Sequence, residues 1–137
     1  MAVSQPTGLA PEAAYFDYDR LYPTNSQNVL RPEVAESLLI LYRVTGDKTY
    51  RDWGWEIFRG FERSSRMCSG YSGLLDTQST NHKYRIDRME SGFIAGTLKY
   101  LYLLFSDRTL FPLDDWVFNS HGHMLPINPL AHNGVWY

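Results

Sequence analysis

Three short stretches of this sequence place reactive side chains together. Arg31, Glu33 and Glu36 open one apolar run, Glu90 opens another, and Ser120 precedes two histidines that are separated by a single glycine. Carboxylates act as general acids or bases, and paired histidines can share a metal ion. Acidic residues in a first helical turn are also favoured by the helix dipole alone, and two histidines without a third ligand are weak evidence for a metal site. On local grounds both a functional and a purely structural interpretation are open.

Helices are the elements that must position these residues. Pro32 suits a first helical turn, because its missing N–H needs no partner there and its φ is already helical. The apolar run behind it predicts a helix over 32–45, ended by Gly46 and buried nearly all round. A second helix is predicted over 50–66, which makes an antiparallel helical hairpin with the first. The third predicted helix covers 89–106 and begins with the stretch that holds Glu90.

The remaining segments are rich in turn-forming residues. Residues 1–29 predict an irregular lead-in with a short extended piece at 14–16 and a loop at 22–28. So long an irregular terminus is unusual for a complete domain. Short strands or ordered loops are predicted at 69–75 and 82–87, a strand at 116–120, and an irregular tail at 128–137.

The composition narrows the classes of protein. The 137 residues are 44% hydrophobic, enough for one ordinary domain. The formal net charge of -2, without a basic block, argues against nucleic acid or an anionic membrane as the partner. No apolar run approaches the roughly 20 residues of a membrane span, and the first residues do not resemble a signal peptide. A single cysteine excludes an internal disulfide.

Read in order, the sequence resembles glycoside hydrolase family 47, the class I α-mannosidases. The resemblance covers about 5–127 and is carried by TGLAPE (7–12), LRPEVAES (30–37), LYRVTGD (41–47), DWGW (52–55), RMES (88–91), TLKY (97–100) and VFN (117–119). Ordered motifs over this length are specific. The chain is similar to the C-terminal part of such an enzyme.

The resemblance implies a fold and an activity. The family folds as an (α/α)7 barrel, so residues 1–137 are expected to be mainly α: a partial barrel of about two helical hairpins plus short β-strands. Residues 1–29 would lead into it and 128–137 would trail it. The family removes α-1,2-linked mannose from high-mannose N-glycans with inversion, uses Ca2+, and works in the secretory pathway, in the endoplasmic reticulum or Golgi or after secretion.

Residue by residue, the resemblance also implies roles. Glu33 matches the general base, which takes a proton from the attacking water. Arg31, Glu36 and Glu90 match residues that contact the sugar or line its pocket. Ser120 stands where the family has a threonine that binds calcium through its carbonyl and hydroxyl oxygens, and serine keeps both.

The sequence also departs from the family. Gly92 replaces an aromatic ring that lies under the sugar, Gly96 replaces a glutamate near the metal, and 121–123 read His-Gly-His in place of Glu-Ala-His. The general acid of the family matches no position in this chain. Calcium needs six to eight oxygens, far more than Ser120 supplies, so we do not expect the isolated chain to bind it. The sequence therefore predicts an α-1,2-mannosidase family member that is inactive as this isolated chain, or alternatively a non-catalytic, lectin-like remnant.

Overall fold

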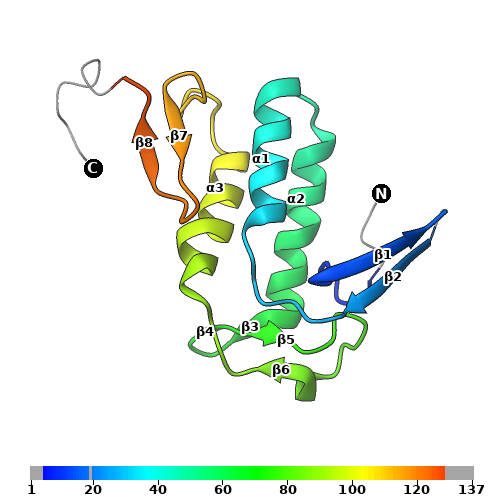
Figure 1. Cartoon of the computed structure of the whole chain (residues 1–137). Helices are drawn as coiled ribbons and strands as arrows, with labels where there is room; N and C mark the ends of the chain where they lie inside the picture. The colour runs from blue at the N-terminus through cyan, green and yellow to red at the C-terminus, as the bar shows by residue number, and fades with distance from the viewer. Residues whose placement is uncertain (1–4, 19, 129–137) are drawn as a thin grey trace.

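The computed structural model describes residues 5–18 and 20–128 (Figure 1). Three helices lie side by side, with α1 (Glu33–Thr45) packed against both α2 (Thr49–Gly60) and α3 (Lys99–Phe105). Two π-helical segments extend this set: η1 (Phe61–Ser65) continues α2, and η3 (Phe93–Leu98) leads into α3. The predictions of a mainly helical chain and of an antiparallel α1–α2 hairpin are confirmed.

Helix α1 begins one residue after the predicted start and ends at the predicted residue, Thr45. Gly46 takes up the left-handed conformation at φ 74°, and its N–H donates to the carbonyl of Tyr42 at 2.8 Å. Such a residue satisfies the last carbonyls of a helix, and glycine adopts it without strain. The turn to α2 is closed by Asp47, whose Oδ1 accepts the N–H of Thr49 at 2.9 Å.

The prediction that α1 is buried nearly all round is wrong. One face of the helix is buried, and it consists of Ala35, Leu38, Leu39, Tyr42 and Arg43. The opposite face is exposed and consists of Val34, Ile40, Leu41 and Val44, the last with 75% of its surface accessible. The reason is geometric, because α2 and α3 pack against α1 and also against each other, and this leaves the rest of the α1 surface uncovered by the described helices.

The long third helix starts at Ser91, two residues after the predicted position, and runs through η3 and α3 to Phe105. It packs closely on α2, since a Cβ atom on Gly54 would lie 2.4 Å from Leu104 Cδ2. At the other end of the contact, the Phe61 and Phe93 rings meet edge to face with centroids 5.2 Å apart. The two π segments therefore face each other across the core.

The strands form short antiparallel pairs around the helices. β1 (Ala13–Asp17) pairs with β2 (Arg20–Asn25), and this hairpin projects away from the helices (Figure 1). The predicted loop at 22–28 is thus wrong over 22–25, where Tyr22 pairs across the hairpin with Tyr15. Cross-strand pairing of this kind stabilises β2 despite the turn preference of Pro23 and Asn25, which follow Tyr22 in the strand.

The other pairs come after α2 in the chain, two of them before the third helix and one after it. β3 (Arg66–Met67) pairs with β4 (Gly70–Tyr71), β5 (Gly73–Leu74) with β6 (Arg85–Ile86), and β7 (Trp116–Phe118) with β8 (Met124–Pro126). A single 3-10 turn, η2 (His82–Tyr84), precedes β6. The strand predicted at 116–120 ends two residues early, and its partner β8 was not predicted. The tail predicted at 128–137 lies outside the described residues except for Asn128.

The lead-in is irregular in its first part but well anchored. Thr7 and Leu9 are each 1% exposed, and the Thr7 hydroxyl donates to the Thr77 carbonyl at 2.7 Å. A Cβ atom on Gly60 of α2 would lie 2.9 Å from Leu9 Cδ2, so the lead-in lies directly on this helix. Within the described residues, no helix has the length and apolar character to cross a membrane.

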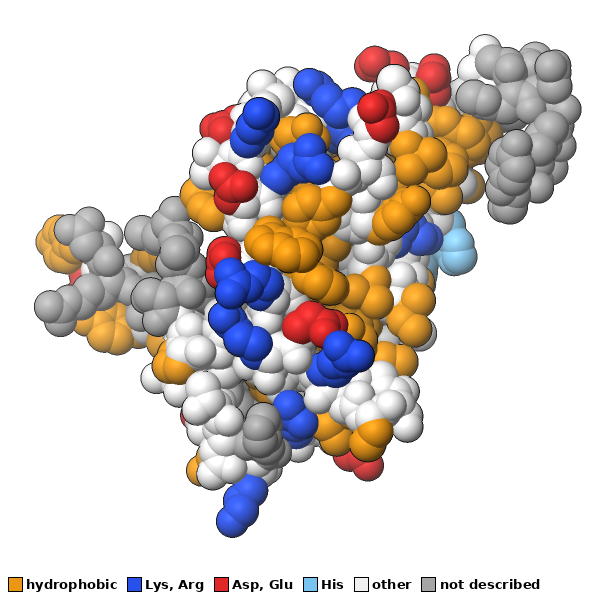
Figure 2. Space-filling model, turned by 180° about the vertical axis from the view of Figure 1, so that it is seen from behind, with side chains coloured by type: hydrophobic (Ala, Val, Ile, Leu, Met, Phe, Trp, Pro, Cys, Tyr) orange, Lys and Arg blue, Asp and Glu red, His pale blue; other side chains and the backbone are white. Residues whose placement is uncertain are grey.

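Apolar surface is not confined to α1. Figure 2 shows the molecule from behind, where apolar side chains gather over the middle of the face among scattered charged ones. Two exposed tryptophans, Trp53 and Trp55, lie on α2, with the Trp55 ring against Phe58 and Phe105. The helical layer therefore presents apolar groups on more than one side.

Candidate functional site

The fold brings the three reactive stretches together through a chain of close contacts. Pro32 at the start of α1 meets Gly96 of η3, where a Cβ atom would lie only 2.7 Å from the proline Cβ. Gly122 also packs on η3 next to Gly96, since a Cβ atom on Gly122 would lie 2.6 Å from the Ala95 carbonyl oxygen. Lys99 then fastens this loop by donating from Nζ to the Gly122 carbonyl at 2.6 Å. Residues 31–36, 90–97 and 119–123 thus form one neighbourhood.

Glu33 lies exposed in the first turn of α1. Its carboxylate makes no hydrogen bond or ion pair with any residue that the structure describes. Its backbone carbonyl accepts the Ser37 hydroxyl one turn later, at 2.8 Å. The carboxylate is therefore open to solvent and to a ligand.

Arg31 is held by a residue from the lead-in. Its Nε donates to Glu12 Oε2 at 2.6 Å, and the other carboxylate oxygen of Glu12 accepts the N–H of Val29 at 2.9 Å. The Glu12 side chain is 15% exposed and the Arg31 side chain 63%. Because only Nε is engaged, the terminal guanidinium nitrogens of Arg31 remain available to a ligand.

Glu36 is half-buried one turn into α1, close enough to Tyr100 to influence its ionisation. Burial, helped by the negative charge of Glu36, raises the pKa of Tyr100. Both effects disfavour the phenolate, so Tyr100 stays protonated at neutral pH. The ring of Tyr100 also packs edge to face on Phe118 of β7, with centroids 5.4 Å apart.

Glu90 precedes the third helix and forms an ion pair with Arg88 at 2.5 Å. A cavity of about 350 Å³ lies directly beside this pair, and Arg88 is part of its wall. The cavity is lined by residues 67–72 and 87–89. Glu90 is therefore placed at the edge of a hollow, paired with an exposed arginine.

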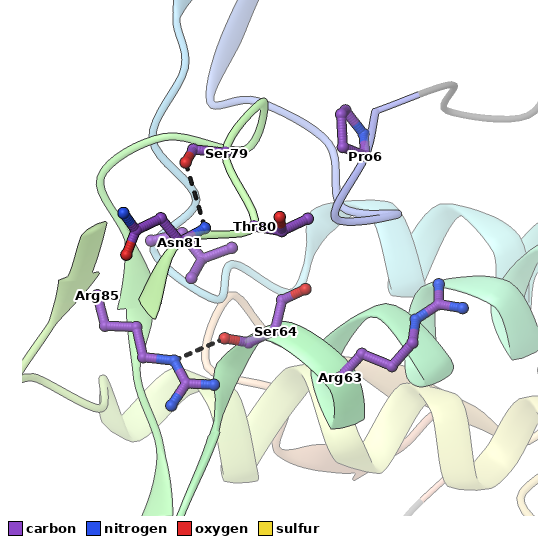
Figure 3. A pocket seen from close by; sticks show the side chains of 8 residues that line it. Pro6, Arg63, Ser64, Ser79, Thr80, Asn81 and Arg85 are labelled. Carbon is purple, nitrogen blue, oxygen red and sulfur yellow. Dashed lines mark hydrogen bonds between the residues drawn. The ribbon is translucent and has the colours of Figure 1, made fainter. Parts of the chain in front are cut away.

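A second cavity, of about 250 Å³, contains none of the predicted site residues. Figure 3 shows Arg63 and Arg85 on opposite sides of it. Arg85 is fixed by donating from Nε to the Ser64 carbonyl at 2.9 Å. Because its lining includes none of the residues that the sequence singles out, this cavity is not the candidate site.

Ser120 and the two histidines lie in the turn between β7 and β8. The N–H groups of His121 and His123 both donate to Asn119 Oδ1, each at 2.9 Å. The Ser120 hydroxyl lies 3.3 Å from His121 Nδ1. Because the strand ends at Phe118, the histidines do not stand side by side on an extended segment, as a strand through 120–123 would have placed them.

The described residues do not provide a complete calcium shell. Among them, no three His, Cys, Asp or Glu side chains are placed to hold a metal ion. Ser120 is exposed and offers two oxygens, and Asn119 Oδ1 already accepts two backbone N–H groups. Six to eight oxygens are needed, so the residues present do not fit the ion by themselves.

The two glycines of the third helix differ sharply in their surroundings. A Cβ atom on Gly92 would meet nothing within 4 Å, so open space lies where a larger side chain would project. Gly96 has no such space, because Pro32 occupies it. Gly92 thus leaves a vacancy near Glu90, and Gly96 permits the contact that holds the neighbourhood together.

Sequence reasoning missed two contributors to this neighbourhood. Glu12 fixes Arg31 from 19 positions away, and Lys99 holds the Gly122 loop. Both residues fall inside motifs that carry the family resemblance, TGLAPE and TLKY. The signal was present there, but the partners could not be known without the fold.

The fold is that of an α-mannosidase segment. It is similar to the α-1,2-mannosidase from Trichoderma reesei, with a TM-score of 0.82 and 30% identity, over 90% of this chain and 30% of that chain. In sequence the chain is 50% identical over 125 residues to mannosyl-oligosaccharide 1,2-alpha-mannosidase MNS1 of Arabidopsis thaliana, covering 90% of this chain and 22% of the relative. It is 49% identical over 131 residues to the endoplasmic reticulum mannosyl-oligosaccharide 1,2-alpha-mannosidase of Mus musculus, covering 88% and 20%.

The pattern of glycosyl hydrolase family 47 matches residues 1–127. The chain belongs to this family. It spans about a fifth of the length of the curated relatives it matches.

Proposed function

We propose that this chain carries the general-base side of an α-1,2-mannosidase site for high-mannose N-glycans. The observation that carries the proposal is the contact chain from Pro32 through Gly96 to Gly122, which gathers the three reactive stretches. The relatives are named as mannosyl-oligosaccharide 1,2-alpha-mannosidases, which supports the reaction class. In this proposal the three helices are part of an (α/α)7 barrel in a protein of the secretory pathway.

Each site residue has a role in the proposal. Glu33 accepts a proton from the water that attacks the anomeric carbon, which gives inversion. An inverting enzyme needs room for this water, with its two carboxyl groups about 6.5–9.5 Å apart. Arg31, aligned by Glu12, donates to sugar hydroxyls, while Glu36 and Glu90 accept from them at the wall of the pocket.

The isolated chain is proposed to bind without turning over. An acid that protonates the leaving oxygen is worth about 10²- to 10⁴-fold in rate, and the resemblance assigns that role to no residue of this chain. The space beside Gly92 supports the same conclusion, because no ring fills it to stack on the sugar. Ser120 is retained as one proposed calcium contact, but no step of the proposal depends on the ion.

The test is a titration of the ¹⁵N-labelled chain with α-1,2-mannobiose, followed by amide shifts and by chromatography of free mannose. We expect shifts at residues 31–36 and 90–93 and no mannose release. Arg31→Gln should weaken these shifts, while Arg59→Gln, an exposed arginine paired with Glu56, should leave them unchanged. Shifts confined to other segments would refute the placement of the site, and mannose release would refute the proposed inactivity.

The alternative is a lectin-like remnant that binds mannose and never served a reaction in this form. The exposed and prearranged guanidinium of Arg31 favours binding of either kind. Sequencing the transcript upstream of these codons distinguishes the two. An in-frame sequence with the remaining hairpins and an acid carboxylate supports the enzyme, and its absence supports the remnant.

A further inference from the structure

The residue before Arg31 has a strained backbone. Leu30 adopts φ +65° while its side chain is 0% exposed, fully inside the core. A leucine in the left-handed region is disfavoured because its Cβ crowds the following carbonyl oxygen. Such a conformation persists only where surrounding contacts over-determine it, and it often occurs at functional sites.

Two hydrogen bonds hold Leu30 in place. Its N–H donates to Asn28 Oδ1 at 3.0 Å, a local contact. Its carbonyl accepts the Thr97 hydroxyl at 2.8 Å, a buried contact between residues 67 positions apart. Thr97 is itself 1% exposed and belongs to η3. The long-range bond therefore ties the entry of α1 to the third helix.

The position of this strain matters for the residues that follow. Pro32 fixes its own φ, so the path of the chain through Arg31 and Glu33 depends on the backbone at Leu30. Gly96 of η3 packs on Pro32, and the residue that follows it in the helix is Thr97. Lys99, two residues further on, holds the Gly122 carbonyl. One stretch of the third helix thus secures both edges of the neighbourhood, and π-helical turns are frequent at functional sites.

We propose that Thr97 is a positioning residue, which holds Leu30 in the left-handed conformation and thereby sets the direction of Arg31 and Glu33. The importance of these two side chains rests on the proposed function. The geometric claim does not, because it concerns the backbone at 30–33 and is measured without substrate.

The experiment compares hydroxyl deletions in the ¹⁵N,¹³C-labelled chain. Thr97→Val removes the donor at nearly constant volume, and Thr97→Ser keeps it. Thr7→Val is the matched control, since Thr7 is equally buried and its hydroxyl also donates to a distant carbonyl, that of Thr77, at 2.7 Å. The readouts are the Leu30 carbon shifts and HN–Hα coupling, which report φ, and amide hydrogen exchange at residues 30, 31 and 33.

We expect the wild-type chain to show the left-handed signature at Leu30. Thr97→Val should remove it and speed amide exchange at 30–33 by about tenfold or more, the equivalent of one lost hydrogen bond. Thr97→Ser should restore both readouts. Thr7→Val should lower the melting temperature comparably yet leave residues 30–33 unchanged. An unaltered Leu30 in Thr97→Val, or equal changes in Thr7→Val, would overturn the proposal.

A second comparison covers the case in which Thr97→Val does not fold. Leu30→Ala and Leu30→Gly remove the same buried side chain, so they differ mainly in backbone preference. At an ordinary φ alanine is the more stable of the two, whereas at positive φ glycine is favoured. A higher urea midpoint for Leu30→Gly than for Leu30→Ala would support the left-handed conformation of Leu30. A higher midpoint for Leu30→Ala would refute it. Neither result depends on mannobiose binding, so the failure of this inference and that of the proposed function are separable.

Discussion

Gly96 and Pro32 approach so closely that a Cβ atom on Gly96 would lie 2.7 Å from the proline Cβ and 3.1 Å from its Cγ. Real Cβ atoms essentially never come so near, and the proline ring is rigid, so a larger residue requires movement of α1 or η3. The glycine is therefore a condition of the contact between the α1 entry and the third helix.

Gly96→Ala is expected to lower the free energy of unfolding by about 1–3 kcal/mol, because it overpacks this contact. Gly92→Ala is the matched control four residues earlier in the same helix, where a Cβ meets nothing. It should raise the free energy of unfolding by up to about 1 kcal/mol through helix propensity. Urea unfolding measures both, and equal effects would contradict the geometry.

Arg43→Lys is expected to destabilise the chain by about 2 kcal/mol or more. The buried guanidinium donates to three carbonyls, those of Leu103 at 3.2 Å, Leu110 at 3.0 Å and Arg108. Burial lowers the pKa of Arg43, and the charge of Arg108 lowers it further. A lysine ammonium cannot reach all three acceptors from one position.

The control for this change is Arg59→Lys, on the exposed face of α2, where Arg59 pairs with Glu56 at 3.2 Å. An exposed pair of this kind contributes little, so the change should stay within about 0.5 kcal/mol. Equal losses of unfolding free energy in the two variants would show that the three carbonyl contacts of Arg43 stabilise the chain no more than the exposed ion pair of Arg59 does.

Tyr71→Phe is expected to remove a pH-dependent part of the stability. The Tyr71 hydroxyl donates to Glu62 Oε1, which lowers the pKa of the Glu62 carboxyl and raises the pKa of Tyr71. A lowered carboxyl pKa contributes stability that is lost as the pH falls through the folded value. A raised tyrosine pKa contributes stability that is lost as the pH rises through its own folded value.

The wild type should therefore exceed Tyr71→Phe by about 1 kcal/mol between roughly pH 5 and 9, and by less outside that window. The phenylalanine keeps the ring contact with Phe93, whose centroid is 4.8 Å away, so packing is nearly constant. Urea unfolding at acidic, neutral and basic pH gives the difference. A difference that does not vary with pH would assign the loss to packing.

Calcium is expected to leave the melting temperature of the isolated chain unchanged, since a ligand that does not bind the folded state cannot stabilise it. Thermal unfolding in millimolar CaCl₂ and in chelator measures this, with magnesium as the ionic control. A calcium-specific rise in the melting temperature would contradict this expectation. If that rise disappeared in Ser120→Ala, Ser120 would be identified as a calcium ligand.

The helices were predictable because their signals are local. The proline at 32 and the glycine at 46 bracket α1, and the apolar period marks the third helix to within two residues of its start. Strand β2 was not predicted, because Pro23 and Asn25 suggest a turn and the pairing of Tyr22 with Tyr15 is invisible in a local window. The exposure of Val44 was missed for a similar reason, since burial depends on which elements arrive from elsewhere.

The residues of the candidate site could be named from the sequence, but the contacts that connect them could not. In the structure, the stretches that hold Glu33, Glu90 and Ser120 are connected through the contacts of Pro32, Gly96, Gly122 and Lys99. The contact of Glu12 with Arg31 and the strain at Leu30 depend on distant backbone and have no local signature. The individual roles of the five site residues stay predictions until the titration above is done.

The π turn in the third helix has a consequence for length variation. Its i→i+5 pairing accommodates one residue more than an α-helical turn does, so the two halves of the helix keep separate registers. The half near Phe93 faces Phe61 and Tyr71, while Leu101 and Leu104 belong to the core against α2. A single-residue deletion within Phe93–Leu98 would straighten the helix and rotate one half relative to the other. The chain would then keep in register either the contacts of Phe93 with Phe61 and Tyr71 or those of Leu101 and Leu104 with α2, but not both.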